Sequence, residues 1–176
     1  MITLPELAAS SLEKFLGDFM RNRFGSSPAV VQIVPSAARL SLELIGNSDA
    51  LYHNVEHTLL VTLAGHDILR GRALHTTVTA DDYAHAILAC LTHDIGYVRG
   101  LFGDDDADGY VIDAQGGKVS LPRGASDASL MPHHVDRSKL YVMNRIDGLA
   151  PLDSKRIADA IEGTRFPAPA GYECGE

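Results

Sequence analysis

Two pairs of chemically active residues stand at spacings suited to binding a metal ion. His53 and His57 are four residues apart, and His93 is followed directly by Asp94. Residues four apart on a helix share one face and lie about one turn from each other, so the two histidines are expected side by side. Imidazole and carboxylate groups on rigid elements are common ligands of divalent metals. An isolated histidine is more simply explained as a surface or capping residue, but the two pairs together predict a metal site.

Helical patterns surround both pairs. Apolar residues recur at the three- and four-residue spacing of amphipathic helices. Thr79, with Asp82 three residues later, matches the capping box that begins a helix, and Pro35 is suited to the first turn of another. The pattern therefore predicts one all-α domain, with helices over residues 4–24, 35–44, 53–70, 79–96, 135–146 and 152–161.

A long segment without helical pattern interrupts the domain. Glycine and aspartate are frequent from residue 96 to residue 131, and the apolar runs 110–112 and 118–121 predict a small β-hairpin. Loops of this length inside a compact domain are usually functional or disordered. We divide the domain into N-terminal helices (1–50), core helices of the metal site (51–100), an acidic insertion (101–131) and C-terminal helices (132–176).

The insertion contains an acidic run from Asp104 to Gly109 that has the residue order of a calcium-binding loop. The twelfth position of that loop is Gln115, where a bidentate glutamate is expected. A solvated acidic loop is the simpler interpretation. The remaining single histidines, His66, His75 and His85, are expected at the surface, since His66 lies opposite His57 on the predicted helix.

The composition excludes several classes of protein. The chain has 176 residues and 23 acidic against 15 basic side chains, a formal net charge of −8. This charge disfavours binding to a nucleic acid polymer, and no apolar run approaches the roughly 18 residues of a membrane span. Two cysteines form no disulfide framework, and the first residues lack an export signal. We therefore expect a cytoplasmic protein with a small substrate.

The motifs Tyr52–His57 and Leu91–Tyr97, taken together, resemble the HD-domain superfamily of metal-dependent phosphohydrolases. The Tyr-His-Asn-x-x-His form and the interval to His-Asp are most similar to the branch that contains the cyclic nucleotide phosphodiesterases. Residues 132–139 and 161–166 resemble later blocks of bacterial members. The resemblance spans roughly residues 51–169 and implies an HD-type, phosphodiesterase-like helical bundle.

The resemblance also implies roles for the residues of the two motifs. His57, His93 and Asp94 would bind the metal, and Asp94 would also bridge to a second ion or hold the attacking water. His53 would be the general acid that protonates the leaving oxygen, a role suited to a group that titrates near neutral pH. Asn54 would orient its neighbours through hydrogen bonds.

Three further residues are candidates for contact with the substrate. His134 matches a polar position near the metal in the resembling family. Arg137 and Lys139 follow it in the chain, and cations near a metal suit a phosphate group, although ordinary surface charges would look the same. The function implied is hydrolysis of a phosphate ester, a nucleotide phosphomonoester or phosphodiester, with one or two ions of Mn, Mg, Fe, Zn or Ni.

Two alternatives remain open at this point. One is a catalytically silent HD module that binds a nucleotide or a partner protein in signalling. The other keeps the ligand set but uses it as a diiron oxygenase, as some HD-like proteins do.

The carboxyl end departs from the pattern of the resembling family, which places another Asp ligand on a helix beyond the Thr-x-Phe block. Here the chain ends at Glu176, ten residues after Phe166. We therefore expect a C-terminally truncated domain with an open metal site. Exposed apolar strips are normally covered by a partner, so we also expect a homodimer through a partly uncovered strip formed by Val135, Leu140, Val142, Ile146, Ile157 and Ile161.

Overall fold

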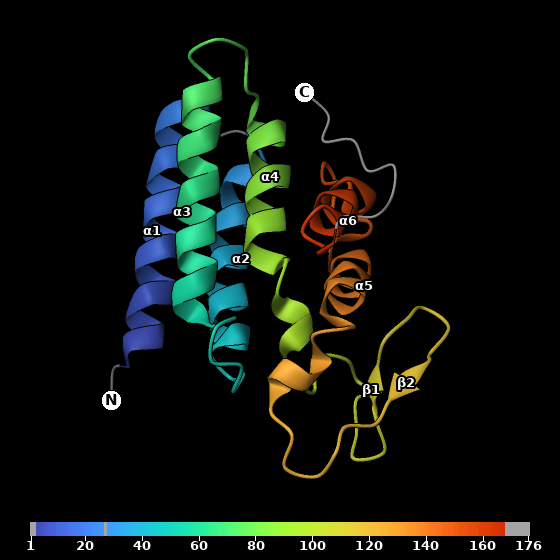
Figure 1. Cartoon of the computed structure of the whole chain (residues 1–176). Helices are drawn as coiled ribbons and strands as arrows, with labels where there is room; N and C mark the ends of the chain where they lie inside the picture. Colours follow the sequence, from blue (N-terminus) through green and yellow to red (C-terminus); the bar gives the residue numbers. More distant parts are fainter. Residues whose placement is uncertain (1–2, 27, 168–176) are drawn as a thin grey trace.

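The computed structural model describes residues 3–26 and 28–167 and contains, within them, six α-helices and one two-stranded antiparallel hairpin. Figure 1 shows the helices forming the body of the domain, with the hairpin beside one end of it. The all-α prediction and the small hairpin are both confirmed. The elements are α1 (Leu4–Phe24), α2 (Val30–Ile45), α3 (Val55–Arg72), α4 (Ala80–Thr92), the 3-10 turn η1 (Ile95–Tyr97), β1 (Tyr110–Val111), β2 (Lys118–Val119), the 3-10 turn η2 (Asp127–Leu130), α5 (His134–Ile146) and α6 (Ser154–Glu162).

The helix α4 is the centre of the packing. It contacts α2 and α3 on one side and α6 on the other, while α1 packs on α2 and α5 packs on α6 (Figure 1). Apolar side chains from all six helices form one continuous core. The carboxyl end of α4 and the turn η1 therefore emerge between the first turn of α3 and the first turn of α5, and η1 packs directly on α5.

The helix starts follow the capping chemistry of the sequence. The hydroxyl of Thr79 accepts a hydrogen bond from the backbone N–H of Asp82, whose carboxylate accepts one from the N–H of Thr79, so the predicted capping box is confirmed. The predicted start of the second helix is wrong, because α2 begins at Val30 and contains Pro35 in its interior. Proline removes one helical hydrogen bond, but the buried residues on both sides of it, such as Val31 and Ala38, hold the helix in the core.

The predicted exposed strip of the carboxyl-terminal helices is also wrong. Val142, Ile157 and Ile161 are fully buried in the main core, and Val135 and Ile146 are nearly so. Other helices of the same chain cover the strip, because α5 packs on α6 and α6 packs on α4. Only Leu140 of the six residues is partly exposed, so the strip is not the uncovered surface expected for a homodimer.

None of the helices in residues 3–26 and 28–167 is both long enough and apolar enough to cross a membrane.

Candidate metal centre

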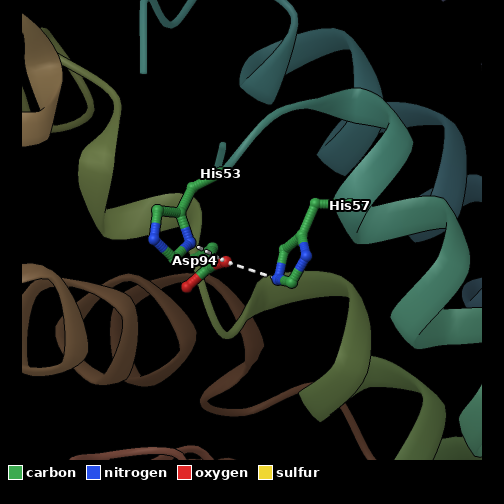
Figure 2. A group of neighbouring side chains, drawn as sticks. All are labelled: His53, His57 and Asp94. Atoms are coloured by element: carbon green, nitrogen blue, oxygen red, sulfur yellow. Dashed lines mark hydrogen bonds and ion pairs between the residues drawn. The ribbon is translucent and has the colours of Figure 1, made fainter. Parts of the chain in front are cut away.

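The buried carboxylate of Asp94 is the centre of the site. It lies between the end of α4 and η1 with only 3% of its surface exposed. Its Oδ2 atom is 2.7 Å from Nδ1 of His53, 3.0 Å from Nε2 of His93 and 3.3 Å from Nε2 of His57. Its Oδ1 atom is 3.8 Å from Nε2 of His134. Four imidazole rings thus surround one carboxylate, and Figure 2 shows His53 and His57 approaching it from the amino end of α3.

The amino end of α3 determines how the first histidine pair is presented. Asn54 is the N-cap of α3: its Oδ1 accepts a hydrogen bond from the backbone N–H of His57, and its Nδ2 donates one to the carbonyl of Leu51. His53 therefore lies in the turn before the helix and His57 in its first turn. The prediction that both stand on one helical face is wrong, although both rings still reach Asp94. Asn54 thus hydrogen-bonds two backbone groups of the turn that carries His53 and His57.

Backbone carbonyls hold two of the four rings in the tautomer that a metal ligand needs. Nδ1 of His93 lies 2.9 Å from the carbonyl of Cys90, and Nδ1 of His134 is hydrogen-bonded to the carbonyl of Met131. A carbonyl only accepts hydrogen bonds, so both Nδ1 atoms carry the proton and each neutral ring presents a lone pair on Nε2, toward Asp94. A lone pair of His93 so close to a carboxylate oxygen is repelled unless a proton or a cation lies between them. The donor set therefore fits a divalent cation.

The pKa shifts favour neutral rings at His57 and His134 but a proton on His93 beside Asp94, a proton that a bound cation would replace. Burial alone would raise the pKa of Asp94, but hydrogen bonds and charges from His93 and His53 lower it to about 2, so the carboxylate is an anion at neutral pH. Burial lowers the pKa of both His57 and His134, which favours the neutral rings that coordinate metals. Burial would also lower the pKa of His93, but the adjacent Asp94 raises it. One ligand atom each from His53, His57 and Asp94 lies within 4.8 Å of the others, so this group could hold a metal ion.

Tyr97 was not predicted as a site residue, but its ring supports two of the four histidines. The ring of His53 stacks on it at 4.4 Å with an interplanar angle of 20°, and the ring of His134 stacks on it at 4.5 Å and 17°. Tyr97 itself is buried. The sequence shows an aromatic residue three positions after Asp94, but only the fold shows which histidine rings stack on it.

Ser138, on α5, fixes the backbone of the His-Asp turn. Its hydroxyl accepts a hydrogen bond from the N–H of Gly96 at 2.9 Å and donates one to the carbonyl of His93 at 2.7 Å. A side chain on Gly96 would collide with the backbone carbonyl of His134. Glycine at this position thus allows the turn that carries Asp94 to touch the start of α5, which carries His134.

Arg137 and Lys139, predicted to contact the substrate, have other partners. The side chain of Arg137 is fully buried; it forms a bidentate ion pair with Asp105 and donates hydrogen bonds to the carbonyls of Gly96, Val98 and Val111. A guanidinium with no exposed surface cannot reach a ligand, so we assign it a structural role. Lys139 is paired with Glu162 at 2.7 Å.

The same ion pair changes the interpretation of the acidic insertion. The carboxylate of Asp105 is buried against Arg137 and also accepts a hydrogen bond from the backbone N–H of Val111. Asp106 is paired with Lys118 at 2.7 Å. Protein donors therefore occupy both carboxylates, and Asp105 is not the solvated loop residue that was expected: it fastens the insertion to α5.

Two histidines predicted at the surface are buried. His66 lies among Phe15, Phe19 and Tyr83, with Nδ1 2.6 Å from the Tyr83 hydroxyl. α3 packs against both α1 and α4, so its face opposite His57 is covered as well. Nδ1 of His85 donates to the carbonyl of Asp81 and its Nε2 accepts from the N–H of Asp153, because α6 covers that part of α4.

A family model described as Npun_R2479-like matches residues 6–175 of the chain. No curated protein and no solved structure matches it.

Proposed function

The chain belongs to the Npun_R2479-like family, and we propose that it is a metal-dependent phosphohydrolase that cleaves a phosphate ester. The observation that carries the proposal is the arrangement around Asp94: a buried anionic carboxylate in contact with His53, His57 and His93, with His93 held in its ligand tautomer. Nitrogen and oxygen donors of this kind favour a first-row transition metal over calcium. The resemblance of the motifs to the HD-domain superfamily supports the same chemistry.

The residues divide into those that would hold the ion and those that would act on the substrate. His57, His93 and Asp94 are the proposed ligands. A bound divalent ion would supply a Lewis acid that polarises the phosphoryl group and makes a water molecule a better nucleophile. His134, whose Nε2 is farther from Asp94 than the nitrogens of the other three rings, would accept a hydrogen bond from a water molecule near the ion through that atom.

His53 is the proposed general acid. Because Asp94 is ionised, Nδ1 of His53 donates its proton to Oδ2 of Asp94 across 2.7 Å. Figure 2 shows the second ring nitrogen of His53 pointing away from Asp94. A histidine oriented by a carboxylate through one nitrogen can transfer a proton through the other. His53 would therefore protonate the departing alkoxide, while the stacking on Tyr97 keeps the ring in place.

Metal titration combined with a hydrolysis assay tests the proposal. The full chain is stripped with a chelator and titrated by calorimetry with Mn²⁺, Mg²⁺, Fe²⁺, Zn²⁺ and Ni²⁺, and each loaded form is assayed with p-nitrophenyl phosphate and bis-p-nitrophenyl phosphate. We expect hydrolysis that depends on the metal and is lost in His57→Ala, His93→Ala and Asp94→Asn. The control is His75→Ala, which changes an exposed histidine in the turn that follows α3.

Each alternative function gives a different result in the same experiment. Tight metal binding without hydrolysis of either ester would contradict the proposal and favour a silent binding module. Oxygen consumption by the iron-loaded protein, without ester hydrolysis, would favour the diiron oxygenase. If the Asp94 variants bound metal as tightly as the parent chain does, the metal would not bind at this site.

A further inference from the structure

A cavity of about 610 Å³ lies directly beside the proposed general acid. It opens between the turn that precedes α3 and the segment of η2. Its lining includes Leu51, Tyr52, His53, Tyr97 and Met131. This volume lies within the range of cavities that bind small organic molecules, and His53 connects it to the candidate metal centre.

The two walls of the cavity are fastened to each other. The backbone N–H of Asp49 donates to the carboxylate of Asp127 at 3.0 Å, and the N–H of Asp127 donates to the carboxylate of Asp49 at 2.5 Å. Asp127 is also paired with Arg99. The cavity is therefore formed before any ligand arrives, which reduces the cost of ordering on binding.

The exposed surface of the cavity is unusually apolar. Leu51, Tyr52 and Met131 expose 92%, 70% and 59% of their surface, although single large apolar residues are normally scattered over a protein. Here the three meet around one opening. A phenol ring and a thioether make favourable contacts with aromatic rings in particular.

The charge of the lining limits what else can bind. Within the described residues that line the cavity, none is lysine or arginine, and the carboxylate of Asp49 is already an acceptor for Asp127. The nearby Arg99 is occupied by Asp127 and the carbonyl of Ala125. A second anionic group on the substrate would be desolvated here without a counter-ion, which is unfavourable.

We infer that this cavity binds the organic part of the substrate, and that this part is an uncharged aromatic group joined to the phosphate that His53 faces. The inference rests on the proposed function and specifies its substrate class: aryl esters, or esters with a flat ring near the phosphate, rather than polyphosphates or sugar phosphates. Met131 and Leu51 are its specificity-determining residues.

Methyl resonances of methionine test the binding directly. The protein is labelled with ¹³C-methyl methionine and titrated with phenyl phosphate and with methyl phosphate, which carries the same phosphate without the ring. The titrations use the metal-free and the Zn²⁺-loaded chain. We expect phenyl phosphate to shift the Met131 signal in at least one form and methyl phosphate to leave it in place. Met143 on α5 and the buried Met20 lie outside the cavity and are internal controls.

Substitution of Met131 gives the second test. Met131→Gln keeps the length and neutral charge of the side chain, so we expect binding of phenyl phosphate to weaken about two- to tenfold, the range of a lost sulfur–aromatic contact, with binding of methyl phosphate unchanged. Met143→Gln, at a half-exposed position on α5, is the matched control. Equal affinity for the two esters, an unmoved Met131 signal, or equal effects of the two variants would overturn the inference.

Hydrolysis rates separate this inference from the proposed function. If phenyl phosphate binds as expected but no metal supports its hydrolysis, the aromatic subsite stands and the proposed function fails. If both esters are hydrolysed with the same KM in the parent chain and in Met131→Gln, the proposed function stands and the aromatic subsite fails.

Discussion

The Nδ1 atom of His53 lies 2.7 Å from Oδ2 of Asp94, although the two residues are 41 positions apart in the chain. One comes from the turn before α3 and the other from the end of α4. The contact orients the ring of His53, and the face of the ring is stacked on Tyr97. A hydrogen bond and a stacking partner together leave the histidine little rotational freedom.

Two substitutions of Tyr97 distinguish the role of its aromatic ring from the role of its hydroxyl group. Tyr97→Phe keeps the surface on which His53 and His134 stack, so we expect the rate of metal-dependent hydrolysis and the histidine ring signals in NMR spectra to be unchanged. Tyr97→Leu removes that surface, and we expect the hydrolysis rate to fall about 10- to 100-fold, the usual effect of losing a residue that orients the groups of a metal site. Equal behaviour of the two variants would show that the stacking has no role in positioning.

Adding one methyl group at Gly96 tests the contact between the His-Asp turn and α5. The new Cβ would collide with the carbonyl of His134 and crowd Cβ of Arg137, so we expect Gly96→Ala to lower the free energy of unfolding by about 1–3 kcal/mol and to weaken metal binding. Gly71→Ala is the control, since nothing lies within 4 Å of its Cβ and alanine favours a helix. Urea denaturation measures both. A stable Gly96→Ala protein with normal metal affinity would contradict the close approach.

The buried pair of Arg137 and Asp105 is expected to behave as a unit. Arg137→Met leaves the carboxylate of Asp105 buried without its cation, and we expect a loss of about 3–5 kcal/mol in unfolding free energy. The double variant Arg137→Met, Asp105→Leu removes both charges and should be more stable than the single variant. Denaturation of the parent chain, of the single variants Arg137→Met and Asp105→Leu and of the double variant gives the coupling energy; additive effects would show that the pair is not coupled.

Acid is expected to destabilise the end of α6. Hydrogen bonds from Arg165 and Lys139 lower the pKa of Glu162 from 4.5 to about 2. Since the folded protein holds this carboxylate ionised at lower pH than the unfolded chain does, its contribution to stability is complete above about pH 4.5 and is lost as the pH falls toward 2.

Thermal unfolding between pH 2 and 6 measures this effect. Glu162→Gln should be less stable than the parent chain near pH 6, and the difference should shrink toward pH 2. The exposed Glu56 makes no ion pair within the described part of the chain, so Glu56→Gln is the control. A difference between Glu162→Gln and the parent that is constant with pH would contradict the assignment.

Local signals in the sequence are sufficient to predict a feature that depends on one short segment, such as the start of a helix. The capping box of Thr79 depends on residues three positions apart, and the His-Asp dipeptide follows the last turn of α4 wherever that helix lies. The sequence predicts His53 and His57 on one helix, which is wrong, because Asn54 is the N-cap of α3 and His53 therefore lies in the turn before the helix.

The burial of single histidines and the partner of Arg137 depend on which helices cover which faces of their neighbours. The sequence predicts His66 and His85 at the surface, because amphipathic spacing does not show that α3 and α4 are covered on more than one side. Arg137 was predicted to bind a phosphate group, since no sequence pattern shows that its partner is Asp105, 32 residues earlier. Such long-range pairings arise from the topology, which the sequence does not display.

The fastening of the insertion to α5 has a consequence for how such a protein can diversify. Asp94 and His134 are fixed relative to each other by Ser138 and by the close contact at Gly96, and Arg137 links the carbonyl of Gly96 to Asp105 and Val111 of the insertion. One wall of the cavity beside His53, by contrast, ends in η2, within that intervening segment. Residues around η2 can therefore vary and alter which molecules are admitted, while the contacts of Asp105 and Val111 with Arg137 keep the geometry of the reactive groups.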